Sequence, residues 1–543
     1  MRPKGIGECA VAIEDNRLDI CVQWGNAKYG KGGHVADVTI KPAAVKVKLV
    51  AKITKKPYPK PIQCCVRNSP VSLSQVLHHL KDGADEVIET SCATVVLKGT
   101  KAYKIKKSVD YGFLDFTSAE KRRAALLREL RYNQRMAADI YLGVEDIAGE
   151  SVLVMRRFDT AGVLGEQSAR QSDWAPNLDT MHDLGQLVAR FHAGSEICLD
   201  PQHQNNIKYV IDSNRANIAV FRDELGAEAV DAYDAAINAA YDDVASHVLA
   251  RFDAGFVRHC HGDLHLGNIL IEHGKPILFD CIEFNERLSQ IDVLYDLAFL
   301  LMDLCVRGHD VAANRVLNVW LEQAARLEDD VNAVYAGLKL LPIYMSVRAG
   351  VRCHVNANYV GEGAYAMDKA RMYLQAAHRF LDMKLPSLAA IGGLSGSGKS
   401  TRARAEAPHA GRAPGAVILR SDEIRKRLWA CPEYETLPKE AYAPDESARV
   451  YEHMLDLARI GLETGQSVIL DATFREADWR DRCAALAVSS GLGFDGLWLD
   501  LPADMRAERV AARTKDVSDA TADIAISQQA IDVSAISWRV EVV

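Results

Sequence analysis

Three polar residues in the middle of the chain have types and spacing that suit phosphoryl transfer. Asp263 and Asn268 lie in the stretch HGDLHLGN, and Asp280 ends the apolar segment KPILFD. An aspartate can accept or orient the proton of an acceptor hydroxyl, and an asparagine five residues later can turn back to Mg²⁺. A second carboxylate on the next strand can hold the metal against nucleotide phosphates. This stretch therefore predicts a nucleotide and metal site.

A second phosphate-binding pattern lies far downstream of the first. GLSGSGKS at residues 393–400 matches G-x-x-x-x-G-K-[ST], and it follows the apolar segment LAAI and precedes an expected helix. Glycines let backbone N–H groups wrap around phosphates, a lysine neutralises their charge, and the last hydroxyl ligates Mg²⁺. The predicted ATP contacts are Gly393, Ser395, Gly396, Ser397, Gly398, Lys399, Ser400 and Thr401, and Ser400 is also the predicted metal ligand.

Further charged residues follow this loop at positions where phosphoryl transfer needs them. Asp422 lies in SDEIRKRL, and Asp471 ends the apolar strand SVILD. The segment ADMRAERVAAR places Arg506, Arg509 and Arg513 at i, i+3 and i+7, on one face of a helix, which suits a lid that closes over phosphates. The alternatives are a solvated helix face for the arginines and a helix-capping role for Asp422.

Residues 388–543 resemble the small P-loop kinases, near the polynucleotide-kinase and zeta-toxin-like group. This resemblance implies that Asp422 is the catalytic base for an acceptor hydroxyl and that Asp471 lies near the magnesium. It also implies that Arg509 and Arg513, together with Arg506, form a lid over the bound ATP.

The stretch HGDLHLGN, with its downstream aspartate, resembles the aminoglycoside phosphotransferase and choline-kinase branch of the kinase-like fold, over roughly residues 75–380. The phrases AYKIKK, DYGFLDF, RELRYNQ, YLGV and LFDCIEFNERLSQIDVLYDLAFLLMDL, with a P-loop domain behind them, look like a bacterial family that fuses the two domains. The resemblance carries no agreed substrate.

What this second resemblance implies can be placed residue by residue. Asp263 is the catalytic aspartate, and Asn268 and Asp280 are metal ligands. Lys104 in AYKIKK is the ATP lysine, with Lys106 on the same face of the strand as the alternative. Glu129 in the following helix pairs with the lysine, and Asp296 in DLAFLL hydrogen-bonds the catalytic loop.

Some features depart from the protein-kinase pattern. Asp280 is followed by Cys281 and Ile282 in place of Phe-Gly, so no activation-segment switch is implied, and no G-x-G-x-x-G precedes the strand pair. His261 is interpreted as a packing and hydrogen-bonding residue of the loop. A catalytically dead relic of the site is a further alternative.

The elements that must position these residues indicate two fold classes in one chain. A helix at 71–82, a strand pair in 94–107 with a Gly99-Thr100 turn, a helix at 118–137 and a strand at 150–158 predict an α+β lobe, followed by a helical lobe. Apolar strands near 388, 416, 467 and 496 alternate with helices, which predicts an α/β P-loop domain with a parallel sheet. The predicted divisions are a basic leader (1–70), a kinase-like domain (71–382, lobes 71–160 and 161–382), a linker (383–388) and a P-loop domain (389–543).

Composition restricts the setting of this chemistry. The formal net charge of −8 gives no overall case for nucleic acid or acidic membranes, although residues 38–81 contain no acidic residue and could form a basic arm for a polyanion or a solvated leader. Twelve scattered cysteines, no apolar leader and no run near the ~18 residues that span a membrane favour a soluble cytoplasmic protein with reduced thiols.

The expected activity is ATP-dependent phosphorylation of a small-molecule hydroxyl by the first domain, with a second kinase activity in the P-loop domain. One alternative is a kinase for nucleotide or nucleic-acid 5′-hydroxyls through the P-loop half. Another is a regulatory protein that binds ATP with little turnover. Residue patterns do not identify either acceptor, because the acceptor pocket decides the substrate.

Overall fold

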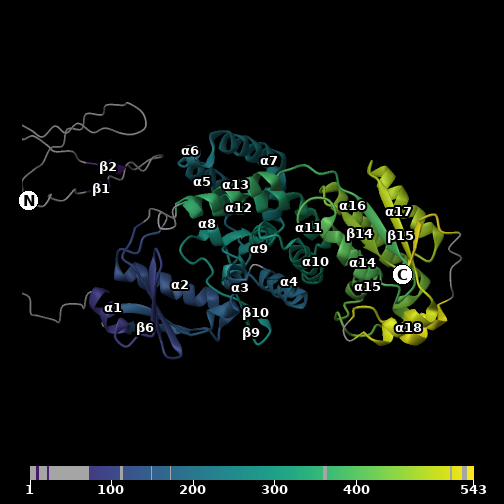
Figure 1. Ribbon diagram of the computed structural model, residues 1–543, viewed down its shortest axis with the longest axis horizontal. Helices are drawn as coiled ribbons and strands as arrows, with labels where there is room; N and C mark the ends of the chain where they lie inside the picture. Colours follow the sequence, from purple (N-terminus) through teal and green to yellow (C-terminus); the bar gives the residue numbers. More distant parts are fainter. Residues whose placement is uncertain are drawn as a thin grey trace, which may run out of the picture. The chain divides into compact units, whose positions relative to one another are not determined.

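The computed structural model divides the chain into two units, Met1–Ser69 and Pro70–Val543 (Figure 1). The residues that it describes are 8–10, 21–23, 73–110, 114–147, 149–171, 173–358, 364–513, 516–528 and 535–543. In the first unit, β1 (Glu8–Ala10) and β2 (Cys21–Gln23) form an antiparallel pair. Apart from these two strands, the predicted basic leader lies outside the described residues, as does the centre of DYGFLDF at 111–113.

The first lobe of the second unit is built on a five-stranded antiparallel sheet with the order β3-β4-β5-β7-β6. The predicted strand pair is the hairpin β4–β5, and Gly99 takes the left-handed conformation (φ +57°) that its tight turn requires. The elements are α1 (Leu73–Lys81), β3 (Glu86–Glu89), β4 (Ala93–Lys98), β5 (Lys101–Lys106), α2 (Ala119–Ala137), β6 (Tyr141–Ile147) and β7 (Glu150–Arg156).

Helix α2 carries the predicted glutamate across the sheet. Its start is fixed by Ser118, whose hydroxyl accepts a hydrogen bond from the backbone N–H of Lys121. Ala125, Leu126 and Glu129 are buried in succession on the face that packs against β6 and β7. The helix thus brings a carboxylate into the interior of the lobe.

The second lobe is helical, with α9 at its centre. All residues of α9 except the last are buried, so this largely apolar helix is covered on every side, as expected of a central helix. Two short antiparallel pairs, β8–β11 and β9–β10, frame the predicted catalytic loop. The elements are α3 (Leu164–Arg170), α4 (Leu178–Ala193), α5 (Asn206–Ala219), α6 (Arg222–Leu225), α7 (Ala227–Asp253), β8 (Val257–His259), β9 (Ile269–Glu272), β10 (Lys275–Leu278), α8 (Glu286–Ser289), β11 (Gln290–Asp292), α9 (Val293–Val306), α10 (Asp310–Leu327), α11 (Val331–Ala336), α12 (Leu341–Ala357) and α13 (Ala364–Phe380).

The C-terminal part contains the predicted parallel sheet, with the order β13-β14-β12-β15-β16. The fifth strand, β16, was not predicted from the sequence. Residues 382–387, before β12, have no regular secondary structure. The elements are β12 (Leu388–Gly392), α14 (Lys399–Glu406), β13 (Val417–Arg420), α15 (Ser421–Leu428), α16 (Pro444–Glu463), β14 (Val468–Asp471), α17 (Ala477–Ser489), β15 (Phe494–Asp500), α18 (Ala503–Ala511), α19 (Ala522–Ser527) and β16 (Arg539–Val542).

Within the described part of the chain, no helix is long and apolar enough to cross a bilayer. The predicted cytoplasmic location stays a prediction.

Candidate active sites

A lysine and a glutamate of the first lobe meet an aspartate of the second lobe. Nζ of Lys104 on β5 lies 2.6 Å from Oε1 of Glu129 on α2 and 2.9 Å from Oδ1 of Asp280, which follows β10. Glu129 has no exposed surface, whereas the Asp280 side chain is 47% exposed. Burial alone would lower the pKa of Lys104, but Asp280 and Glu129 outweigh it and raise this pKa well above its ordinary value. The lysine therefore stays charged, as neutralisation of phosphates requires.

The alternative lysine, Lys106, has a different position. Its Nζ lies 2.7 Å from Oε2 of Glu129 and 2.7 Å from Oε1 of Glu283, and its side chain is 2% exposed. Glu129 is thus held between two lysines. Burial would raise its pKa, but Lys104 and Lys106 lower the pKa of Glu129 to about 2. Glu283 was not predicted from the sequence, although its position three residues after Asp280 was an available signal.

The predicted catalytic loop brings Asp263 and Asn268 into direct contact. Nδ2 of Asn268 donates to the backbone oxygen of Asp263 and to its carboxylate Oδ2, both at 2.9 Å. Nε2 of His265 lies 3.4 Å from the same carboxylate oxygen. Burial would raise the pKa of Asp263, but His265 outweighs it and holds this pKa below its usual range. Asp263 is therefore a carboxylate at neutral pH.

Asp296, in the first turn of α9, holds this loop from the protein interior. Its carboxylate accepts the backbone N–H of His261 at 3.1 Å and that of Gly262 at 2.8 Å, and it contacts Nε2 of His192 at 3.1 Å. Gly262 has φ +82°, and a Cβ there would lie 2.8 Å from the backbone oxygen of Leu288. The turn before Asp263 therefore requires glycine.

His261 joins the loop to the strand that leads to Asp280. Its Nε2 contacts the backbone oxygen of Phe279 at 2.9 Å, and its Nδ1 accepts the N–H of Asp263 at 3.3 Å, which assigns the proton to Nε2. Burial lowers the pKa of His261, so the ring is neutral. Asp280 itself has φ +60°, and its N–H donates to the Tyr141 hydroxyl at 3.0 Å. These contacts agree with a structural role for His261.

The second candidate site is the loop between β12 and α14. Two of its glycines are required by space as well as by backbone conformation. A Cβ on Gly393 (φ +142°) would lie 2.6 Å from the backbone oxygen of Leu499, and one on Gly396 (φ +89°) would lie 2.5 Å from that of Arg506. The loop is therefore clamped against the segments around β15 and α18.

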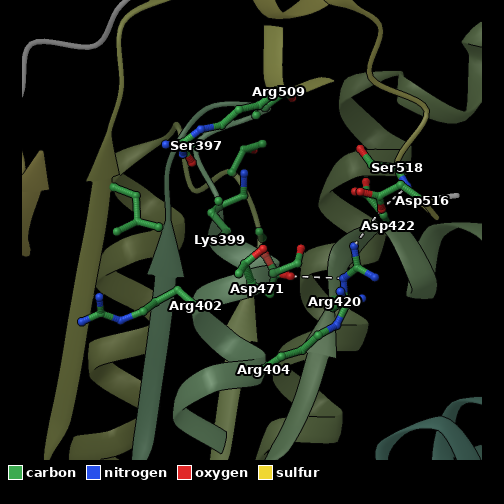
Figure 2. Close-up of a pocket in the computed structure, with 18 of the residues that line it drawn as sticks. Ser397, Lys399, Arg402, Arg404, Arg420, Asp422, Asp471, Arg509, Asp516 and Ser518 are labelled. Atoms are coloured by element: carbon green, nitrogen blue, oxygen red, sulfur yellow. Dashed lines mark hydrogen bonds and ion pairs between the residues drawn. The ribbon is translucent and has the colours of Figure 1, made fainter. Parts of the chain in front are cut away.

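A cavity of about 680 Å³ opens above this loop (Figure 2). Ser397 contributes a buried Oγ that has no hydrogen-bond partner among the described residues. Nζ of Lys399 donates to the backbone oxygen of Leu394 at 3.1 Å, and burial lowers the pKa of Lys399, although Asp471 and Asp422 oppose this. Of the residues predicted for this site, the cavity is lined by Ser395, Gly396, Ser397, Gly398, Lys399, Ser400, Thr401, Asp422, Asp471, Arg509 and Arg513.

The two predicted carboxylates enter the cavity from the ends of neighbouring strands. Asp471 is the last residue of β14, and Asp422 is in the first turn of α15, directly after β13. The N-cap of α15 is Arg420, which makes no side-chain cap hydrogen bond, and Asp422 lies in the first turn, where a carboxylate also stabilises a helix, so both roles for Asp422 stay predictions. The carboxyl ends of parallel strands are where ligands of such sheets bind.

Arg420, at the end of β13, was missed by the sequence analysis. It lies 3.1 Å from Asp471, 3.0 Å from Glu423 and 3.3 Å from Asp516, measured between nitrogen and oxygen atoms. Its position two residues before Asp422 was an available signal. Figure 2 shows Arg420 between Asp471 and the group formed by Asp422, Asp516 and Ser518.

The predicted arginine face is only partly correct. Helix α18 ends at Ala511, so Arg513 lies beyond it, where it forms an ion pair with Asp516 at 3.2 Å. Arg506 is buried and donates to the backbone oxygens of Leu501 and Ser395, at 3.1 and 3.4 Å. Arg506 thus hydrogen-bonds the loop between β12 and α14. Of the three predicted arginines, only Arg509 and Arg513 line the cavity.

Comparison with known proteins covers most of the chain. The uncharacterized protein Rv2004c of Mycobacterium tuberculosis (strain ATCC 25618 / H37Rv) is 32% identical over 458 residues, which are 81% of this chain and 88% of that protein. The uncharacterized protein Mb2027c of Mycobacterium bovis matches to the same extent. Residues 113–331 match the model of the phosphotransferase enzyme family, and residues 388–531 match a model described as an AAA domain.

The chain belongs to a bacterial family that joins an aminoglycoside-phosphotransferase-like domain to a C-terminal P-loop kinase domain. The chain is therefore a phosphotransferase of the kinase type.

Solved structures match each half of this family member separately. The choline kinase of Cryptosporidium parvum Iowa II covers 56% of this chain and 95% of its own, with 12% identity and a TM-score of 0.37. The adenylylsulfate (APS) kinase CysC of Mycobacterium tuberculosis, in complex with AMPPNP and APS, covers 24% and 70%, with 20% identity and a TM-score of 0.20. Identities this low indicate nothing about the substrate.

In this family member, the two sites are built on different folds and share no residue. The first presents a charged lysine beside Asp280 and an ionised Asp263. The second surrounds a phosphate-binding loop with carboxylates and arginines. Both arrangements can neutralise and orient phosphate groups next to a carboxylate, which is what phosphoryl transfer requires of a protein.

Proposed function

We propose that the chain is an ATP-dependent phosphotransferase with two separate nucleotide sites. In the first site, the γ-phosphoryl group passes to a hydroxyl of a small molecule. In the second, the P-loop domain phosphorylates an acceptor of its own. The observation that carries the proposal is the convergence of Lys104, Glu129 and Asp280 from three elements, in addition to a complete P-loop cavity elsewhere.

In the first site, the acceptor oxygen would attack the γ-phosphorus while the bond to the β–γ bridging oxygen breaks and ADP leaves. The hydroxyl proton moves toward the Asp263 carboxylate, which is ionised and held by Asn268. Lys104 neutralises phosphate charge, and Glu129 fixes the position of its ammonium group. Catalysis here consists of positioning and charge neutralisation.

The donor atoms of both sites suit Mg²⁺, which prefers oxygen ligands and would neutralise phosphate charge when bound. Both hydrogen bonds of the Asn268 amide nitrogen go to Asp263, so its Oδ1 is the atom of this amide that can bind a cation. The predicted ligands are Asn268 and Asp280 in the first site, and Ser400 and Asp471 in the second.

In the second site, Lys399 and the backbone of the loop would hold the β- and γ-phosphates, with Arg509 and Arg513 above them. The lining of the cavity by Lys399, Arg509 and Arg513 supports this, because these cations can neutralise phosphate charge. Asp422 would orient the acceptor hydroxyl and accept its proton. The acceptor oxygen again attacks the γ-phosphorus, and ADP leaves with the bridging oxygen.

The test is transfer of label from γ-labelled ATP by the purified full chain to pools of sugars, aminoglycosides, nucleosides and oligonucleotides. Asp263→Ala should abolish labelling of one acceptor and Lys399→Ala labelling of another, each by on the order of 10²–10⁴-fold. Asp478→Ala and Lys384→Ala, which remove exposed charges outside the two sites, are the matched controls.

Each outcome bears on a different statement. If both variants keep full activity, the two-site proposal is wrong. Labelling of oligonucleotides that depends only on Lys399 would favour the nucleic-acid kinase alternative for the P-loop half. Nucleotide binding without any labelled acceptor would favour the regulatory alternative.

A further inference from the structure

The two kinase domains contact each other through the edge of the parallel sheet. Strand β13 is an edge strand, whose unpaired backbone groups need partners. Oδ1 of Asn318, on α10, accepts the N–H of Ile418 at 2.7 Å, and Nδ2 of Asn314 donates to the backbone oxygen of Ala416 at 3.0 Å. These bonds fix α10 of the kinase-like domain against the P-loop domain.

Beside these contacts lies a second cavity, of about 390 Å³, lined by α4 and α10 on one side and by the P-loop domain on the other. It shares Arg404, Arg420 and Asp516 with the cavity above the P-loop. A molecule in the P-loop cavity therefore has the second cavity directly next to it, across these three side chains. The volume is within the range of small-molecule pockets.

Most charged residues of this second cavity have a partner of opposite charge. Arg420 pairs with Glu423 and Asp516, and Arg326 lies 3.1 Å from Glu322. Two arginines of the lining have no such partner.

Arg315, on α10, and Arg404, on α14, have no carboxylate within ion-pair distance among the described residues that line the cavity. Nη2 of Arg315 contacts only Nδ1 of His182, at 3.1 Å. Burial lowers the pKa of Arg315 and Arg420 adds to this effect, although Glu423 and Glu433, which are beyond ion-pair distance, oppose it. Arg315 is half-buried, whereas Arg404 is exposed. A half-buried guanidinium group without an ion-pair partner is unfavourable, so the position of Arg315 favours a bound anion, and Arg404, which lines the same cavity, can add a second contact.

Asp179 and Asp183 also line the cavity and have no ion-pair partner among the described residues, but they do not act as counterions of Arg315. Both are exposed near the start of α4, where water can solvate them. Neither is among the charges that act on Arg315 most strongly, which come from Glu423 and Arg420.

We propose that the acceptor of the P-loop domain is a small molecule that carries an oxyanion, namely a phosphate, sulfate or carboxylate group, held by Arg315 and Arg404. The molecule would extend past the three side chains that both cavities share, so that its hydroxyl lies beside Asp422 in the P-loop cavity. Guanidinium groups suit this ligand, because they bind such oxyanions with two parallel hydrogen bonds. The proposal rests on the proposed kinase function of the P-loop half. It also gives the kinase-like domain a direct part in that reaction, because Arg315 belongs to that domain.

The first test measures Lys399-dependent phosphorylation by the full chain, with Asp263→Ala included to silence the other site. Acceptors are supplied as matched pairs, such as a nucleoside and its 3′-monophosphate, or an alcohol and its carboxylate analogue. Arg315→Gln and Arg404→Gln should each raise KM for the anionic member by about 10–100-fold, with kcat and the KM for ATP within about threefold. Arg459→Gln, which removes an exposed arginine of α16, should change nothing.

Three results would overturn the inference: equal effects of the variants on anionic and neutral acceptors, Lys399-dependent labelling of neutral acceptors only, or labelling of oligonucleotides only. These results leave the proposed kinase function intact. The complete absence of Lys399-dependent labelling would instead contradict that function.

A binding measurement tests the anion site whether or not Lys399-dependent labelling is found. Calorimetric titration of the full chain with inorganic sulfate should detect a site that survives Lys399→Ala, since sulfate can also occupy the P-loop. This site should disappear in the double variant Arg315→Gln/Arg404→Gln. Sulfate binding that is lost with Lys399→Ala, or that persists in the double variant, would contradict the proposal.

Discussion

At the scale of single residues, the two lysines of β5 differ in their partners and therefore in their expected roles. Lys104 reaches Asp280, whereas Lys106 is buried between Glu129 and Glu283. Lys104→Met should lower kcat of the first site by at least about 10²-fold, and it should also cost stability, because it removes one of the two cations of buried Glu129. Lys106→Met should cost about 3–5 kcal/mol of unfolding free energy, because it leaves two buried carboxylates with one cation fewer.

These two variants are compared by acceptor labelling in a Lys399→Ala background and by urea unfolding. The opposite pattern, an inactive but stable Lys106→Met protein and an active Lys104→Met protein, would exchange the two roles.

The depressed pKa of Glu129 makes a second prediction at this scale. Its pKa is 4.5 in the unfolded chain and about 2 in the fold, so its ionised form stabilises the fold above pH 4.5. This contribution, on the order of 3 kcal/mol, is lost as the pH falls from 4.5 toward 2. Glu129→Gln should be less stable at pH 7 and should lose less stability between pH 5 and pH 2.5 than the wild type, by urea unfolding. Parallel pH profiles of the two proteins would contradict the assignment.

The sequence predicted the residues of both sites better than their partners. Asp263 and Asn268 lie in one short motif and Lys399 in another, and in each motif the spacing alone brings the site residues close together. Glu283 and Arg420 each lie within three residues of a predicted site residue, but they act through contacts across the fold, and the sequence does not show which partners they reach.

At the scale of elements, Asp296 shows how α9 controls the catalytic loop. Its carboxylate accepts two backbone N–H groups of the loop at once. In Asp296→Asn only one side-chain oxygen remains, and the amide N–H₂ would face a backbone donor. We expect kcat of the first site to fall about 10–100-fold with the KM for ATP nearly unchanged, because the loop and not the lysine cluster is displaced. A variant with normal kcat would show that the loop keeps its geometry without these two bonds.

Element boundaries were harder to predict where tertiary contacts set them. The alanines and arginines of 507–513 are all good helix formers, so the sequence offers no signal for the end of α18 at Ala511. Beyond that end, Arg513 is held by Asp516 instead. The missed strand β16 is short and mostly exposed, and it pairs only with β15, which leaves no strong apolar pattern.

At the scale of the whole molecule, the joining of the two domains was not predictable, because polar side chains mediate much of it. Asn314 and Asn318 satisfy an edge strand that lies about a hundred residues away in the chain. Neither residue belongs to a motif. The sequence therefore predicted two domains and gave no indication that one supports the other.

The ion pair between Arg427 of α15 and Glu322 of α10 tests how strongly the domains stabilise each other. The Glu322 carboxylate also lies 3.1 Å from Arg326, and its side chain is 16% exposed. Burial and Glu423 raise the pKa of Glu322 above its usual range, although Arg427 opposes this, so the ionised form is costly in the fold. Glu322→Gln should therefore cost less than Arg427→Met, which leaves this carboxylate with one cation fewer and should cost about 3–5 kcal/mol.

The double variant Glu322→Gln/Arg427→Met should recover most of that loss, because no unpaired charge remains in the interface. Urea unfolding followed by the labelling assay of each site provides both readouts. If the domains are independent, Arg427→Met will shift only the transition of the P-loop domain. If α10 transmits the loss, both activities will disappear together as the protein unfolds, and the double variant will restore both. If Glu322→Gln and Arg427→Met lower the free energy of unfolding equally, the ion pair contributes only attraction. Burial of the Glu322 carboxylate would then carry no free-energy cost.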